Sequence, residues 1–262
     1  MRAKSIIILV LGLLLGLSVS LFANRAGIEL NVMMKYYLVG AIFIIVAVFT
    51  VGLLRMLQFK KKSDLILPIL YEEKDTKRFI KETIQLINKS PRITQNLLEM
   101  ALAAGYSADG DDSRAIQILN SVDPRNLADE NQAVYYINQF AFTYNIGNEM
   151  EAIRILEEHK ELLERYENHP FIGGAFAINM VYRYMAEQDY DNAKFFLEKA
   201  NEKCSLPYLR DTIEYLNVDI LIHENNLEEG LLLLQQLKQK NPTPSLLRKI
   251  IKSEEAMKKT TS

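Results

Sequence analysis

The stretch "QDYDNAKFFLEKA", residues 188–200, has the pattern of a turn followed by a helix. Ala193 stands near the start of this helix, where its small side chain would let a second helix approach closely. Leu197 follows four residues later, on the same face of the helix. The stretch therefore predicts the turn and second helix of a two-helix unit, and it raises the question of whether this unit is repeated.

Three other stretches align with it in one register: "GDDSRAIQIL" (110–119), "GNEMEAIRIL" (147–156) and "NNLEEGLLLL" (225–234). The four aligned small residues, which we call the anchors, are Ala115, Ala152, Ala193 and Gly230. Their separations of 37, 41 and 37 residues are in the range of helical-hairpin repeats. A leucine follows each anchor at the fourth position, on the same helix face. The four aligned stretches therefore predict four helical hairpins and an all-α fold.

Turn residues precede the anchors at a constant distance. Gly110 and Gly147 stand five residues before two of them, where glycine can adopt the left-handed conformation that ends a helix. Gln188 and Asn225 hold this position in the other two copies. Upstream of each turn lies an apolar stretch with aromatic residues, such as residues 132–144, which predicts the first helix of the pair.

These residues resemble the tetratricopeptide repeat family, whose units pair two helices and carry a small residue near the start of the second. Residues 188–193, with Leu197 and Ala200, are similar to the family's Gly-Asp-Tyr-x-x-Ala turn and the large and small positions after it. The small residue that the family carries on its first helix is Ala103 in one copy, but Phe140, Val181 and Val218 stand there in the others, which indicates a divergent member. The resemblance covers about residues 92–242 and implies an α-solenoid of about four helix pairs.

The resemblance also implies a use for the first helices, which in this family line a concave face that holds a peptide or a partner protein. Aligned on the anchors, that face would include Leu97, Met100, Ile137, Tyr144, Ile178, Tyr182, Met185, Tyr215 and Asp219. The competing interpretation is that many of these residues belong to the apolar core between neighbouring pairs.

Charge is distributed unevenly along the chain. Residues 1–62 contain eight basic residues and one acid, a net charge of +7, which leaves 23 basic and 32 acidic residues and a net charge of −9 for residues 63–262. The acidic part would repel phosphate, so we expect no nucleic-acid binding. We expect protein or peptide segments that bind it to carry Lys or Arg.

Two uncharged stretches predict membrane helices at about residues 5–24 and 36–54. At 1.5 Å per residue, about 20 residues span the roughly 30 Å of a bilayer core. Lys60, Lys61 and Lys62 follow the second stretch, and basic clusters favour the cytoplasmic side. We therefore expect a multi-pass protein of the cell membrane, embedded through residues 1–62, with both termini and the C-terminal domain in the cytoplasm.

Alternatives remain open for the first stretch. Its basic start and Ala23 also fit a cleaved secretory signal, although the apolar run is long and Leu21 is unfavourable two residues before the cleavage position. Gly12 and Gly16 form a G-x-x-x-G pattern that could support a homo-oligomer. We prefer a helix that packs on its own hairpin partner.

The remaining segments connect and cap these parts. Residues 63–91 are expected to form a connector, interrupted by Pro68, and a first soluble helix that Asp75 caps. Residues 243–262 are expected to form a capping helix and a tail.

The sequence contains no enzyme signature, because glycine-rich phosphate loops, nucleophile elbows and metalloprotease motifs are missing. His159, His169 and His223 are too scattered for a metal site, and Cys204 is the only cysteine. We expect no metal and no cofactor. The leading hypothesis is a membrane-anchored scaffold that binds a partner protein or peptide, ahead of a peptide-sensing regulator and of an enzyme with an unrecognised site.

Overall fold

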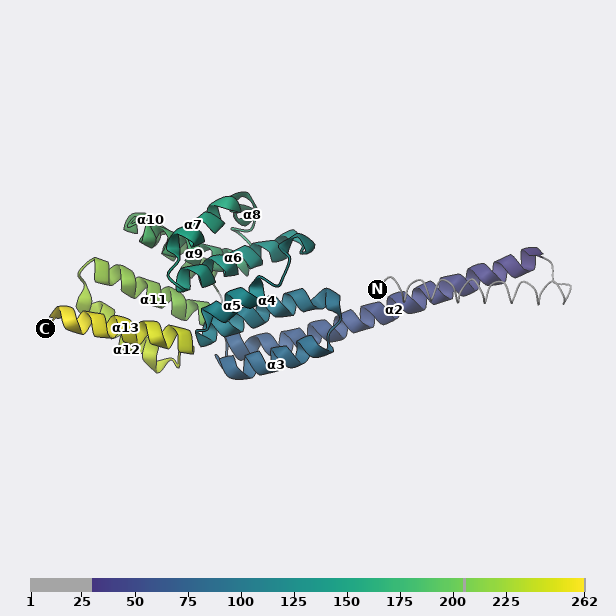
Figure 1. The fold of residues 1–262 in the computed structure, drawn as a ribbon, viewed down its shortest axis with the longest axis horizontal. Coiled ribbons are helices and arrows are strands. Elements are labelled where there is room, and N and C mark those ends of the chain that lie inside the picture. Colours follow the sequence, from purple (N-terminus) through teal and green to yellow (C-terminus); the bar gives the residue numbers. More distant parts are fainter. Residues whose placement is uncertain (1–29, 205, 262) are drawn as a thin grey trace. The chain divides into compact units, whose positions relative to one another are not determined.

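The computed structural model describes residues 30–204 and 206–261, and every regular element within these ranges is helical (Figure 1). The prediction of an all-α fold is confirmed. The chain divides into two compact units, Met1–Lys61 and Lys62–Ser262. The first predicted membrane helix, residues 5–24 with Gly12 and Gly16, lies outside the described residues.

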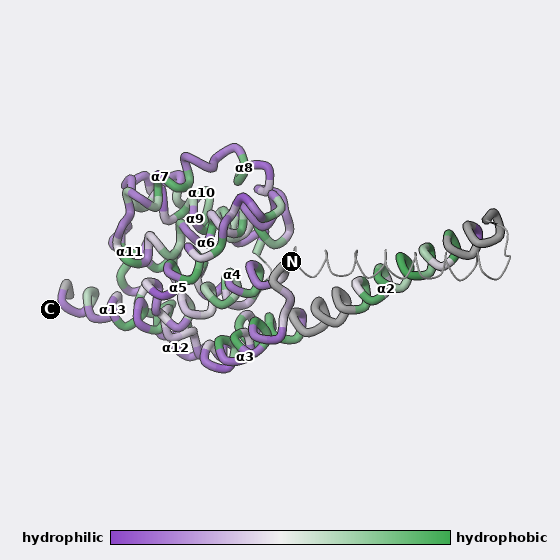
Figure 2. The backbone as a smooth tube through the Cα atoms, turned by 45° about the vertical axis from the view of Figure 1, so that its right-hand side comes forward, coloured by the Kyte–Doolittle hydropathy of each residue, from purple (hydrophilic) through white to green (hydrophobic). Residues whose placement is uncertain are grey.

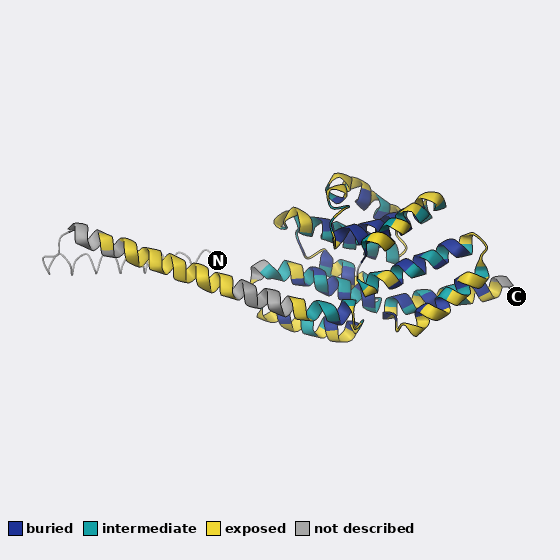
Figure 3. Cartoon of the chain, turned by 180° about the vertical axis from the view of Figure 1, so that it is seen from behind, coloured by how far each residue is buried: buried dark blue, intermediate teal, exposed yellow. Residues whose placement is uncertain are grey.

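Helix α2 (Leu30–Tyr71) contains the second predicted membrane helix and continues through Pro68. Residues 38–54 are uncharged and exposed along this helix, which Figures 2 and 3 show as its apolar and exposed part. Among the described residues, no helix combines the length and the hydropathy needed to cross a membrane. Pro68 has no backbone N–H, so the helix lacks one hydrogen-bond donor there. The carbonyl of Pro68 accepts the N–H groups of Glu72 and Glu73, where the helix ends.

The second unit consists of helical hairpins in sequence order (Figure 1). The four pairs are α4 (Arg92–Asp109) with α5 (Asp112–Leu119), α6 (Asp129–Asn145) with α7 (Glu149–Glu158), α9 (Ile172–Ala186) with α10 (Tyr190–Lys203), and α11 (Pro207–His223) with α12 (Leu227–Gln239). Helix α3 (Thr76–Lys89) precedes them, and α13 (Pro244–Thr261) follows. The 3-10 helix η1 (Pro124–Asn126) and the short α8 (Lys160–Arg165) lie in the connections between pairs.

The four turns within the pairs share one backbone conformation. Gly110, Gly147, Gln188 and Asn225 have φ angles of +89°, +85°, +60° and +60°. The N–H of the residue after each of them bonds to the carbonyl five residues upstream, at 2.8 to 3.2 Å. The left-handed turns predicted at the two glycines are confirmed, and the two residues aligned with them adopt the same conformation although they carry a Cβ.

A further left-handed turn precedes α3, which the alignment of small residues does not reveal. Lys74 has a φ angle of +58°, and the side chain of Asp75 accepts the N–H of Arg78, 3.0 Å away, as the expected N-cap of α3. Phe79 stands five residues after Lys74, at the position of an anchor, and is fully buried against Gly105 of α4. A large side chain takes the anchor position here, so no small-residue pattern marks this turn in the sequence.

The anchors are buried in the unit. Ala115, Ala152 and Ala193 have no exposed surface. A Cβ added at Gly230 would lie 2.8 Å from Cε of Met257 on α13 and 3.8 Å from Cγ1 of Val218 on α11. In the fourth pair, the absence of a side chain at Gly230 therefore allows both α11 and α13 to pack closely against α12.

Candidate functional site

A cavity of about 540 Å3 lies among the first helices of the pairs, within the Lys62–Ser262 unit. Its walls come from the end of α2 and from α4, α6, α9, α11 and α13. Most of the wall is apolar, with side chains such as Leu67, Ile137, Phe142, Ile178 and Leu209. The volume falls within the range of about 300–1,000 Å3 that is usual for small-molecule sites.

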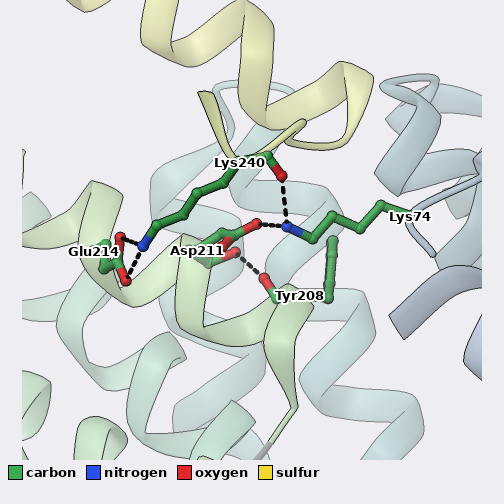
Figure 4. Close-up of polar contacts among 6 residues, drawn as sticks. Lys74, Tyr208, Asp211, Glu214 and Lys240 are labelled. Atoms are coloured by element: carbon green, nitrogen blue, oxygen red, sulfur yellow. Dashed lines mark hydrogen bonds and ion pairs between the residues drawn. The ribbon is translucent and has the colours of Figure 1, made fainter. Parts of the chain in front are cut away.

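The two ends of the series of hairpins meet beside this cavity. The ammonium of Lys74, in the turn before α3, forms an ion pair with Asp211 of α11 and donates to the carbonyl of Lys240, 3.2 Å away (Figure 4). Asp109 at the end of α4 accepts from Thr76 Oγ1 at 2.6 Å, and its carbonyl accepts from Arg248 of α13 at 3.2 Å. We call these contacts the clasp.

The ion pair of the clasp is largely withdrawn from water. The side chains of Lys74 and Asp211 are only 11% and 8% exposed. Lys240 is also held from the other side, because its ammonium lies 2.6 and 2.7 Å from the carboxylate oxygens of Glu214 (Figure 4). Separating a buried ion pair is costly, because each charge would be left without its partner. The clasp therefore holds together two segments that are 137 residues apart in the sequence.

The residues expected on the concave face fall into two groups. Ile178 and Tyr182 line the cavity, and the ring of Tyr144 packs on Tyr182 with centroids 4.8 Å apart. Tyr215 instead meets α13, where its hydroxyl lies 3.0 Å from Oγ of Ser253. Met185 is half-buried beside the core of the unit.

Helix α13 does more than cap the last pair. Its Lys249 enters the cavity and donates from Nζ to Asn145 Oδ1 at 2.9 Å and to the Tyr182 hydroxyl at 3.3 Å. Burial lowers the pKa of Lys249, against the attraction of Asp112 and Asp219. Part of the expected concave face is therefore covered by the chain itself.

Two carboxyl groups belong to the same polar network. Asp112 accepts from Ser107 Oγ at 2.5 Å and from Asn145 Nδ2 at 3.2 Å, and burial raises its pKa above the usual range. Burial also raises the pKa of Asp219 to about 6, although a hydrogen bond with Tyr215 and the charge of Lys249 act in the opposite direction. The network therefore holds acids that are easier to protonate than exposed ones.

One buried hydroxyl among the described residues has no hydrogen-bond partner, and it belongs to a residue that lines the cavity. Thr243, directly before α13, is only 2% exposed, and its Oγ1 is the single buried side-chain oxygen or nitrogen without a partner among the described residues. Its backbone carbonyl accepts the N–H of Leu247 at 2.9 Å, which starts the helix. Ser245 and Leu246 of the first turn also line the cavity.

Sequence reasoning missed Lys74, Asp211, Thr243 and Lys249. The ion pair joins distant segments, so no local pattern marks it. Lys249 of α13 has a signal in the sequence, because it follows the buried Leu246 by three residues and flanks the apolar face of an amphipathic helix. A charged residue on such a face indicates a buried polar contact.

The described residues hold no group of three or more His, Cys, Asp or Glu side chains that could bind a metal ion. Cys204 is 5% exposed, and burial raises the pKa of its thiol, which disfavours the reactive thiolate. No family model, curated protein or solved structure matches the chain.

Proposed function

We propose that the protein is a membrane-anchored scaffold of tetratricopeptide-like helical pairs that holds a segment of a partner protein or peptide. The observation that carries this proposal is the cavity, because side chains from α4, α6, α9 and α11, four successive first helices, converge on it. The polar side chains of Asn138, Asn179 and Thr212 among its apolar walls suit a peptide, which presents both apolar groups and backbone hydrogen-bonding groups.

The membrane anchor is part of the same proposal. Residues 36–54 carry no charge, and the side chains of residues 38–54 are exposed. This run exposes large apolar side chains; Phe43 and Phe49, for example, have exposed fractions of 71% and 73%. Such a continuous apolar surface is unfavourable in water and favourable in lipid. Two spans, at residues 5–24 and 36–54, would keep the helical pairs at the cytoplasmic face of the cell membrane.

A substitution that fills the cavity tests the scaffold. Ala175 of α9 lines the cavity, whereas Ala128 before α6 is exposed and lies outside it. We expect Ala175→Phe to abolish capture of partner proteins from detergent extracts, and Ala128→Phe to leave capture unchanged. Equal capture by the two variants, with equal melting temperatures, would remove the cavity from partner binding.

A second candidate function is a regulator that senses a small ligand. The clasp favours it, because Lys74 and Arg248 join the ends of the series beside the cavity. A ligand that binds inside should stabilise the contacts between α13 and the first helices. Hydrogen exchange of α13 would then slow on ligand addition, and unchanged exchange with every bound ligand would exclude sensing through this helix.

A further inference from the structure

Lys249 is a nucleophilic side chain in the wall of the cavity. Of the described residues that line the cavity, it alone carries an amine. Part of its surface stays accessible, and Nζ lies 2.9 Å from Asn145 Oδ1 and 3.3 Å from the Tyr182 hydroxyl, two groups of the same wall. The polar ends of these three residues therefore meet at the cavity.

The two hydrogen bonds of Nζ match a neutral amine. Both partners are uncharged acceptors, and no carboxylate among the described residues lies within the 4.0 Å of an ion pair. An ammonium has three N–H groups, so one of them would lack an acceptor among these contacts, whereas a neutral amine has two and both are bonded. The neutral form also keeps a free lone pair, which is what attacks an electrophilic carbon.

Burial favours the same neutral form. It lowers the pKa of Lys249 and outweighs the attraction of Asp112 and Asp219, which favours the ammonium. The ring of Tyr182, with its centroid 5.2 Å from Nζ, also favours the ammonium. Burial raises the pKa of both acids as well, that of Asp219 to about 6, so their negative charge is itself disfavoured. A desolvated lysine without a close counter-ion is the kind that reacts with carbonyl groups.

The rest of the cavity selects what can reach this amine. Its wall is mostly apolar, with Phe142, Ile178 and Leu246 among the lining residues, and its volume is about 540 Å3. Such a site favours a small apolar molecule over a polar one. Among small apolar molecules, an aldehyde has the electrophilic carbon with which a neutral amine reacts reversibly.

We propose that Lys249 captures a small apolar aldehyde in the cavity as an imine. The lone pair of Nζ forms a bond to the carbonyl carbon, and one proton passes from nitrogen to the carbonyl oxygen. This hydroxyl then leaves with the second proton of the nitrogen, so that one amine and one aldehyde give one imine and one water, without oxidant or reductant. The inference goes beyond the proposed scaffold, because it needs no partner protein.

Reductive alkylation of the full chain in detergent tests the capture. Limiting hexanal is added at pH 7 with cyanoborohydride, which reduces an imine to a stable secondary amine, and peptide mass spectrometry follows the adduct at each lysine over time. Only about one in 2,500 exposed lysines is neutral at this pH. We therefore expect Lys249 to be labelled at least about tenfold faster than Lys252, which is exposed on the same helix. Equal or slower labelling of Lys249 would overturn the proposal.

A polar aldehyde tests the substrate class. Glyceraldehyde has the same reactive group as hexanal, but its hydroxyl groups do not suit an apolar wall. The ratio of the labelling rates of Lys249 and Lys252 should therefore be at least about tenfold higher with hexanal than with glyceraldehyde. The same ratio for both aldehydes would show that the cavity does not select the apolar one, and the assignment would fail.

Two further measurements show whether the reaction takes place in the cavity. Ala175→Phe fills the cavity and should slow the labelling of Lys249 about tenfold without affecting Lys252, whereas Ala128→Phe, outside the cavity, should change neither rate. An excess of hexanol, which occupies the cavity without reacting, should slow Lys249 in the native chain, so the test does not depend on the folding of a variant. Labelling of Lys249 that hexanol leaves unchanged would contradict capture in the cavity.

Discussion

Asp219 and Lys249 lie in one polar network, and burial disfavours the charged form of both. Tyr215 donates to the first, while Asn145 and Tyr182 accept from the second. Each charge is thus held by neutral hydrogen-bonding groups and not by a close ion pair. At the scale of single residues, the raised pKa of Asp219, about 6, therefore makes this network sensitive to pH.

Asp219→Asn should change how stability depends on pH. The pKa of Asp219 is about 6 in the folded protein, whereas the ordinary value for an aspartate in the unfolded chain is 3.8. The folded state therefore binds the proton more tightly than the unfolded state. Stability from this group is fully present below pH about 4 and is lost as pH rises to about 6. Relative to the native chain, the variant should gain on the order of 2 kcal/mol between pH 4 and pH 7.5. Denaturant unfolding at both pH values measures this gain, and an equal difference at both would refute the raised pKa.

At the scale of elements, the repeated turn is the feature that the sequence predicts best. The anchors and the positions five residues before them determine one local geometry, and the structure has it at Gly110, Gly147, Gln188 and Asn225. Such local patterns are visible because the residues that make the contact are close in the chain. The turn at Lys74 has the same left-handed backbone conformation, but the sequence does not predict it. The buried residue five positions later is Phe79, whereas the other turns have alanine or glycine there.

Gln188→Gly should stabilise the α9–α10 turn. A residue with a Cβ in the left-handed region costs about 1–2 kcal/mol, which glycine avoids. Part of this gain is offset by the greater freedom of glycine in the unfolded chain, so we expect a net gain of about 0.5–1 kcal/mol. Glu198→Gly, on the exposed face of α10, should instead lose about 1 kcal/mol. Thermal unfolding followed by circular dichroism compares the two, and a loss in both would contradict the interpretation of the turn.

The candidate site is less predictable than the turns. Ile178 and Tyr182 line the cavity and were expected on the concave face from the alignment. Thr243 and Lys249 were not, because their place depends on how α13 packs against α4 and the cavity. Contacts between segments more than 100 residues apart leave no periodic signal in a single sequence.

At the scale of the whole molecule, the proposed topology places the helical pairs in the cytoplasm and residues 25–35 outside the cell. The basic cluster at residues 60–62 supports this orientation. Cys204 is buried and would react poorly on either side, so it cannot report on topology. An exposed reporter is needed, and Met150 is 79% exposed.

Cysteine labelling in intact cells, in a Cys204→Ser background, should give opposite results at two positions. We expect Asn31→Cys to react with an impermeant reagent, because residues 25–35 face outward in the proposed topology. Met150→Cys should react only after permeabilisation. The reverse pattern would invert the topology and exclude a cytoplasmic scaffold.

The clasp decides whether the helical pairs enclose a cavity or form an open series. Lys74 and Asp211 are 137 residues apart and belong to opposite ends of the unit. Their energetic coupling therefore reports directly on whether the two ends meet.

A double-mutant cycle with Lys74→Met and Asp211→Asn measures this coupling through denaturant unfolding of the full chain. Each single variant leaves a buried charge without its partner and should cost about 3–5 kcal/mol. The exposed pair Arg165 and Asp129, which lies outside the clasp, provides the control, with a coupling below about 1 kcal/mol. We expect the loss of unfolding free energy in the double variant to be smaller than the sum of the two single losses by about 2 kcal/mol or more. Additive effects at Lys74 and Asp211 would show that the ends do not meet and that the cavity is open.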